Sequence, residues 1–361
     1  MRAAPGQLVA GRYRVTDRPT GAGLPAQDVH TGAPVLLHAL DLPELLVPGG
    51  ADDDLYEDAD ARRGDRIAGP VAALADRVPR HPRLLVETGA AAEGDLLWVA
   101  AERLAGAPLA ELADGGPVPP YRVAELAADL AGALRALHGA GLVHGHVTAD
   151  AVLVCEDGAA MLGGLLLGAA REAVCLQLAG SVPRRRYEAR ADLFGPRAEH
   201  WPADAGPPGD CWALGVLLYR LLTGHGPYPE DDLPTLLAAV RDGRRYPADG
   251  CGPLRGLVEE LLDLGPTARP TAEDVQRRVR AVLAGAPEPF GPGEEEPPLL
   301  PVVRPAGPVV PHPRGRRHGE RHLPVPRGPS RVPPALLGPL LVGGVLLALV
   351  AALAAVVLTA G

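Results

Sequence analysis

Two histidines and an aspartate, His144, His146 and Asp150, stand close together near the middle of the chain. An imidazole takes up a proton near neutral pH, so His146 has the chemistry of a general base. The carboxylate of Asp150 has the chemistry of a ligand for a hard metal ion. Side by side, the two would suit the removal of a proton from a hydroxyl beside a bound metal.

A helix, a loop and a hairpin must position these side chains. The run Val123–His138 has apolar residues at helical spacing. Two short apolar runs, Val152–Val154 and Ala159–Leu162, flank the turn Glu156-Asp157-Gly158 and predict a β-hairpin. The histidines therefore belong to a loop before the hairpin, and a second loop is expected after it.

This order resembles the catalytic and metal-binding loops of actinobacterial-type serine/threonine protein kinases. Such kinases place His-Arg-Asp-Leu-Lys-Pro-x-Asn before the hairpin and Asp-Phe-Gly after it. Here the motifs read HGHVTADA at 144–151 and GLL at 164–166. The resemblance implies an α+β, two-lobed kinase-like domain at 1–286, with a small β-rich lobe at about 8–101 and a helical lobe at about 105–286.

The positions that the resemblance assigns to chemistry hold other residues. His38, in the predicted strand Ala33–Leu40, replaces the phosphate-binding Lys, and the chain has no Lys and no Asn anywhere. His146 replaces the catalytic Asp, Ala151 the Asn and Gly164 the metal-binding Asp. No catalytic residue and no metal site is expected, which implies a pseudokinase. A divergent kinase that transfers the ATP γ-phosphate to protein hydroxyls, with His146 as base, stays open as the alternative.

A nucleotide site is only weakly indicated. Pro25 removes a backbone N–H where the glycine-rich hairpin of the family needs a strand. No cofactor is expected, but hinge contacts come from the backbone, so ATP without Mg²⁺ stays open. The residues that the resemblance assigns to this site are Gly21 and Gly23 in the hairpin, Ala101 as gatekeeper, and Glu102 and Leu104 in the hinge.

In the large lobe, residues at structural positions match the pattern of the family that the chain resembles. Asp210 begins the helix-like run Asp210–Gly224 and is expected to accept hydrogen bonds from the backbone near His144. Glu199 and Arg269 match a buried ion pair of the family. The other expected elements are helices at Arg66–Ala75 (broken by Pro70), Leu109–Asp114, Leu254–Leu264 and Thr271–Ala284, and strands at Arg83–Glu87 and Asp95–Ala101.

The C-terminal part has a different composition. Residues 287–334 are rich in Pro and Arg and predict a disordered cytoplasmic linker. Residues 335–360 carry no charge and are long enough for a transmembrane helix. The arginines before that run predict a single-pass protein of the cell membrane, with the kinase-like domain in the cytoplasm and the C-terminus outside. A buried core helix is the alternative for 335–360, and Gly344 and Ala348 leave a homodimer open.

Composition narrows the classes of partner. The chain has 361 residues, a net charge of −9 and 47% hydrophobic residues, which suits one two-lobed domain with appendages. Its four cysteines form no C-x-x-C pair, so neither zinc nor a disulfide framework is expected and a reducing compartment is inferred. The Arg-rich run lacks aromatic residues for base stacking, which argues against nucleic acid. A protein partner is expected, either an active kinase or its substrate.

Overall fold

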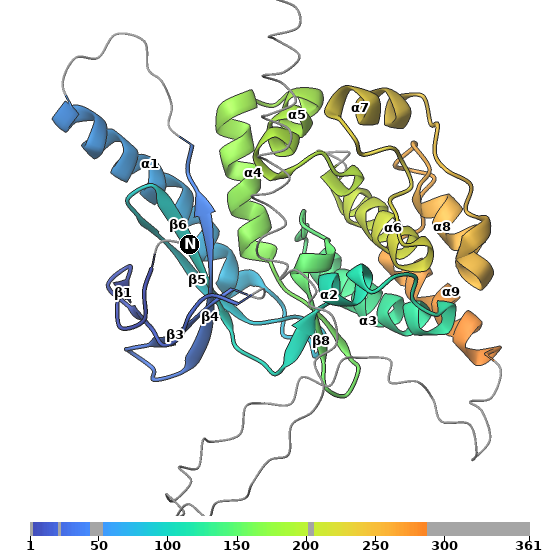
Figure 1. Cartoon of the computed structure of the whole chain (residues 1–361), viewed down its shortest axis with the longest axis horizontal. Helices are drawn as coiled ribbons and strands as arrows, with labels where there is room; N and C mark the ends of the chain where they lie inside the picture. The colour runs from blue at the N-terminus through green and yellow to red at the C-terminus, as the bar shows by residue number, and fades with distance from the viewer. Residues whose placement is uncertain (1–2, 21–22, 44–52, 201–205, 287–361) are drawn as a thin grey trace, which may run out of the picture. The chain divides into compact units, whose positions relative to one another are not determined.

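The computed structural model describes residues 3–20, 23–43, 53–200 and 206–286. A β-rich N-terminal part is followed by a helical C-terminal part, which fits a two-lobed protein-kinase fold (Figure 1). Gly21, the predicted linker at 287–334 and the predicted membrane helix at 335–360 lie outside the described residues.

The N-terminal part is an antiparallel sheet, which in the described residues has the strand order β1-β2-β3-β4-β6-β5. Alternating side chains of β4, among them Val35 and Leu37, point into an apolar cluster that also contains Tyr13 and Trp98. The strands are β1 (Leu8–Val9), β2 (Tyr13–Val15), β3 (Leu24–Asp28), β4 (Pro34–Asp41), β5 (Glu87–Glu93) and β6 (Leu96–Glu102).

Two expectations for this sheet are wrong. The strand predicted at Arg83–Glu87 begins where that range ends, because the Ala-rich segment Glu87–Glu93 pairs with β6 in spite of its low strand propensity. Pro25 does not interrupt its strand. It lies inside β3 opposite Leu36, and its carbonyl accepts a hydrogen bond of 2.9 Å from the Thr16 N–H.

Helix α1 (Asp53–Leu74) packs on the sheet. It is longer than the predicted Arg66–Ala75, and Pro70 lies within it and does not end it. Ile67, Ala68 and Val71 are buried and join the main core. A short turn of 3₁₀ helix (Ala75–Arg77) follows.

The C-terminal part contains the expected helix, loop and hairpin. Helix α3 (Pro120–Gly139) leads into the histidine loop, and the hairpin strands β8 (Val152–Cys155) and β9 (Ala160–Leu162) follow with β7 (Gly106–Pro108) at their edge. The remaining helices are α2 (Leu109–Asp114), α4 (Leu165–Ala179), α5 (Pro183–Phe194), α6 (Pro207–Thr223), α7 (Leu233–Arg241), α8 (Arg255–Leu261) and α9 (Ala272–Ala284), with 3₁₀ turns at Ala149–Ala151, Ala198–His200 and Asp249–Leu254.

Local signals explain where the matched helices begin and end. Thr271 caps α9 in a reciprocal capping box with Asp274, as expected from the sequence. Gly224 ends α6 in the left-handed conformation, with φ +79°. Helix α6 is buried along almost its whole length and lies at the centre of the large lobe's core.

The segment after the hairpin differs most from expectation. A loop was predicted there, but the chain forms α4 directly after Gly164 and α5 soon afterwards. Helix α4 packs against α1, α5 and strands β4, β5 and β6, and it stands between the sheet and the large-lobe helices (Figure 1). It therefore occupies the space between the two lobes.

Among the described residues, no single helix is both long enough and apolar enough to cross a membrane. The bent pair Leu165–Ala179 and Arg184–Phe194, with 118° between its members, meets the length and composition test when the two are taken together. All four cysteines of the chain are described, and none forms a disulfide.

Candidate functional site

Asp210 holds the histidine loop in place. Its Oδ2 accepts a hydrogen bond of 2.8 Å from the His144 N–H, and its Oδ1 accepts one of 2.8 Å from the Gly145 N–H. His138 Nε2 lies 2.8 Å from the same carboxylate. This is the backbone contact that the sequence predicts for Asp210, and it fixes the loop from the start of α6.

His144 links the histidine loop to the segment after the hairpin. Its Nε2 lies 3.0 Å from the Gly163 carbonyl, and its Nδ1 accepts a hydrogen bond of 3.2 Å from the His146 N–H. This pattern requires the hydrogen on Nε2. Burial lowers the pKa of His144, so the ring is neutral. Its role is to hold the two segments together.

Gly164 stands at the position of the metal-binding Asp and has no room for a side chain. Its φ is +81°, a left-handed conformation that favours glycine. A Cβ there would lie 3.2 Å from the Ala151 Cβ and 3.3 Å from the His146 Cδ2. A carboxylate at this position would require both neighbours to move.

Glu87 of β5 contacts the first turn of α4. Its Oε2 accepts a hydrogen bond of 2.9 Å from the Leu166 N–H, which is one of the free donors at the helix N-terminus. Burial raises the pKa of Glu87 to about 7, although the nearby N–H groups of α4 oppose that shift. The sequence gives no signal for this contact, because the two residues are far apart in the chain.

Gly168 brings α4 into direct contact with the histidine loop. A Cβ on Gly168 would lie 2.6 Å from the His146 Cβ and 2.9 Å from the His144 carbonyl oxygen. Only a residue without a side chain allows so close an approach. The helix is therefore seated on the loop that would carry catalysis in a kinase.

Arg171 extends from α4 across this region. Its Nη1 lies 3.0 Å from Nε2 of His146, and its guanidinium stacks 4.5 Å from the centre of the Phe194 ring. Burial, and then the charge of Arg171, lower the pKa of His38 to about 4. His38 is therefore neutral near pH 7 and does not supply the charge of the missing Lys.

Arg63 ties α1 to α4. Its Nε donates a hydrogen bond of 3.0 Å to Gln177 Oε1, its Nη1 donates to the Pro43 carbonyl, and the residue is only 5% exposed. The sequence lacks a Glu near Val71, where a kinase has the partner of its strand Lys. A buried cation that contacts α4 lies on this helix instead, and sequence reasoning missed it.

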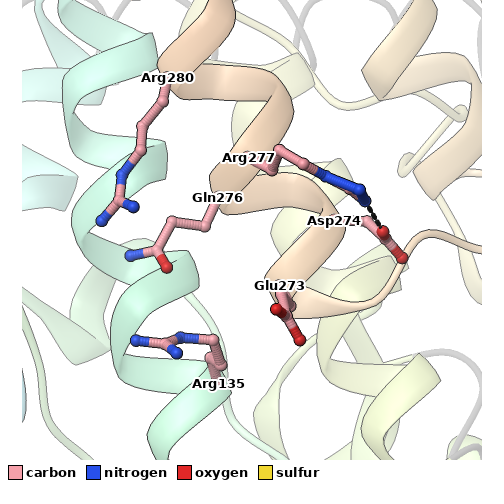
Figure 2. Close-up of a pocket in the computed structure, with 6 residues that line it drawn as sticks. All are labelled: Arg135, Glu273, Asp274, Gln276, Arg277 and Arg280. Atoms are coloured by element: carbon pink, nitrogen blue, oxygen red, sulfur yellow. Dashed lines mark hydrogen bonds and ion pairs between the residues drawn. The ribbon is translucent and has the colours of Figure 1, made fainter.

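The predicted nucleotide residues that the structure describes lie just before β3 and at the end of β6. Ala101 is buried and pairs with Leu36, and the Glu102 side chain accepts a hydrogen bond of 2.7 Å from the Val86 N–H. Leu104 is 41% exposed, and Gly23, with φ +138°, would place a Cβ against Leu36. A hollow of about 570 Å³ lies elsewhere, between α3 and α9 (Figure 2), and is lined by Arg135, Glu273, Asp274, Gln276, Arg277 and Arg280.

These residues do not fit Mg²⁺-ATP. His38 is neutral, Ala151 has no ligand atom, and Gly164 leaves no space for a carboxylate. In the part of the chain that the structure describes, no three His, Cys, Asp or Glu side chains are grouped as a metal site would need.

The expected ion pair between Glu199 and Arg269 is wrong. Glu199 pairs with Arg220, whose Nε lies 3.4 Å from Glu199 Oε1, and Arg220 also reaches Glu230 at 2.7 Å. Arg269 donates to the carbonyls of Asp263, Pro208 and Leu264 and stacks 4.9 Å from the Trp212 ring centre. An Arg at position 220 of α6 is closer to Glu199 and takes its place.

Comparison with known proteins gives relatives of one kind, although no family model matches the chain. It is 31% identical over 253 residues to the serine/threonine-protein kinase AfsK of Streptomyces griseus, which covers 67% of this chain and 29% of AfsK. It is 30% identical over 209 residues to PkaA of Streptomyces coelicolor, covering 57% of this chain and 38% of PkaA. Mouse PAK 4 is 26% identical over 219 residues, covering 58% of this chain and 35% of PAK 4.

These matches come from bacteria and animals, and each of the three relatives is named as a serine/threonine protein kinase. The chain spans about a third of the length of the curated relatives it matches first.

Proposed function

We propose that this relative of serine/threonine protein kinases is a membrane-anchored pseudokinase, which regulates or scaffolds signalling through protein–protein contacts without phosphotransfer. The observation that carries the proposal is the seating of α4 on the histidine loop, with Gly168 against His146. The anchor would be the apolar run at 335–360, and the partner an active kinase or its substrate.

Phosphotransfer needs positive charge on the phosphates, a bound metal and a base that can take the hydroxyl proton. His38 is uncharged near pH 7, and Gly164 leaves no space for a metal ligand. The charge of Arg171 acts on His38, but Arg171 already contacts His146 and Phe194. The chain's own helix thus takes the positions that Mg²⁺-ATP and a substrate hydroxyl would need.

The alternative is a divergent kinase with His146 as base. Arg171 Nη1 lies 3.0 Å from Nε2 and 3.3 Å from Nδ1 of His146, so whichever ring nitrogen acts as the base faces the guanidinium. That nitrogen would have to leave Arg171 before it could take a proton from a substrate. The alternative therefore requires α4 to move away from the loop as a first step.

The decisive experiment is the thermal melting of the purified full chain with ATP, in the presence and absence of Mg²⁺ or Mn²⁺. A ligand that binds only the folded state raises the melting temperature. We expect no shift with ATP at millimolar concentration and no transfer of labelled phosphate to a general protein substrate. A metal-dependent shift together with phosphate transfer that is lost in His146→Ala would overturn the proposal in favour of the divergent kinase.

A further inference from the structure

The turn between α4 and α5 exposes large apolar side chains. Leu176 is 45% exposed, Leu178 39% and Val182 48%, and they flank the exposed residues Gly180 and Ser181. Leu176 and Leu178 belong to the last turn of α4 and Val182 lies just before α5, so large apolar side chains are exposed on both sides of the turn. These three side chains are called the apolar tip below.

The rest of α4 does not share this exposure. Leu166, Val174 and Cys175 are fully buried, and Leu165 is 5% exposed, because the first turns of the helix pack between the two lobes. Only the end of α4 extends beyond that packing, where it bends into α5 at 118°. The tip is therefore a local feature of the turn.

Positive charge stands directly beside the tip. Arg184 and Arg185 are exposed in the first turn of α5, and residues 176–185 contain no acidic residue. Arg184 forms an exposed ion pair with Glu188 at 2.9 Å, while Arg185 forms no ion pair with the residues that the structure describes. The turn thus presents apolar side chains with arginines at their edge.

We propose that the α4–α5 turn, residues 176–185, is a membrane-contact surface that inserts its apolar tip into a leaflet rich in anionic lipid. Apolar side chains flanked by arginines match the boundary between acyl chains and negative headgroups. Three side chains on a turn are far fewer than a stable protein interface needs, which is roughly 800 Å² on each partner. A lipid surface needs only a few, provided that something else keeps the domain near the membrane.

This proposal rests on the proposed anchor at 335–360, which would supply that proximity. The test uses the full chain reconstituted in vesicles whose acyl chains carry bromine, which quenches nearby tryptophan fluorescence. Leu178→Trp places a reporter on the tip, and the parent chain gives the background of its three tryptophans, of which Trp98 and Trp212 are buried. One set of vesicles contains phosphatidylcholine alone, and the other contains about one third phosphatidylglycerol.

We expect the reporter at 178 to be quenched roughly twofold more strongly in the phosphatidylglycerol vesicles than in the neutral ones. Arg184→Gln combined with Arg185→Gln should abolish that difference. A matched reporter at Leu264→Trp, a leucine 42% exposed after α8, should be quenched equally and weakly in both. Equal quenching of the reporters at 178 and 264 would overturn the membrane contact. Equal quenching is also the result expected if the turn binds a protein partner.

The experiment distinguishes a wrong proposal for the anchor at 335–360 from a wrong proposal for the turn. If the chain floats with neutral vesicles, the anchor holds, and quenching at 178 alone decides the turn. If the chain does not float with neutral vesicles, the anchor of the proposed function is wrong. The phosphatidylglycerol vesicles then test whether the arginines alone bring the turn to the surface: stronger quenching at 178 than at 264 supports the membrane contact, and equal quenching overturns it.

Discussion

Arg171 of α4 places its Nη1 3.0 Å from Nε2 of His146 and so joins the helix after the hairpin to the loop before it. The same Nη1 lies 3.3 Å from Nδ1 of His146, so the guanidinium faces both ring nitrogens. The same helix contacts Glu87 through its first turn and Arg63 through Gln177. The region between the lobes is thus closed by contacts within the chain.

Gly168→Ala tests whether α4 is seated on the histidine loop. Alanine normally stabilises a helix relative to glycine, but the new methyl group would lie 2.6 Å from the His146 Cβ. We expect the substitution to lower the free energy of unfolding by about 1–3 kcal/mol, the usual result of overpacking. Urea unfolding of the full chain, followed by circular dichroism, measures this change.

The matched control is Gly256→Ala in α8, where a Cβ would meet no atom within 4 Å. This variant should gain about 0.5 kcal/mol from the helix propensity of alanine. Stabilisation of the same size in both variants would mean that α4 does not rest on His146.

Glu87→Gln tests the buried carboxyl that receives α4. The pKa of Glu87 is raised to about 7 by burial, whereas an unfolded chain has it at about 4.3. Between these values the folded state keeps a proton that the unfolded state has lost, so this group makes stability fall as pH rises. The amide retains an acceptor for the Leu166 N–H and cannot ionise. We expect the parent, compared with the variant, to lose up to a few kcal/mol between about pH 4 and pH 7.

His38 acts in the opposite direction in part of the same window, because its pKa is lowered to about 4 in the folded state. The quantity to measure is therefore the difference in unfolding free energy between parent and variant at each pH. Glu93→Gln, at the exposed end of the same strand, serves as the control for the change from a carboxyl to an amide. A pH-independent difference for Glu87→Gln would show that burial does not raise the pKa of Glu87 in the folded state.

The large lobe was predictable because its signals are local. Asp210 and Gly224 mark the ends of a long apolar run, and Thr271 with Asp274 forms a capping box within four consecutive residues. The hairpin was found in the same way, from two apolar runs around a turn that ends in Gly158. In each case, residues near in sequence decide the structure.

Helix α4 was not predictable for the opposite reason. Gly168 disfavours a helix by local propensity and Gly164 precedes the helix in the left-handed conformation, yet each is needed where the backbone approaches the histidine loop. The contacts that stabilise the helix come from distant residues, such as Arg63, which lies 114 positions from Gln177. The pairing of Glu199 with Arg220 was missed because another arginine matched the family pattern.

Asp210→Ala tests the anchor of the histidine loop. It removes the acceptor from the N–H groups of His144 and Gly145, and Asp210 is only 2% exposed. Each buried donor left without a partner costs about 1–3 kcal/mol, so we expect a loss of about 3–5 kcal/mol in unfolding free energy. Asp210→Asn keeps one acceptor and should lose less. Equal losses in the two variants would show that the carboxylate's hydrogen bonds do not stabilise the loop.

The partner of Glu199 can be determined with two double-mutant cycles. Glu199 is buried against Arg220, and burial raises the pKa of Glu199 in spite of that cation. Arg220→Met and Glu199→Gln should couple by about 1–3 kcal/mol, since each change alone alters the balance of a buried charge pair. Arg269→Met should be destabilising by itself, because Arg269 holds three carbonyls. Its coupling to Glu199→Gln should nevertheless stay within about 0.5 kcal/mol. A larger coupling with Arg269 than with Arg220 would restore the family's ion pair and contradict the geometry described here.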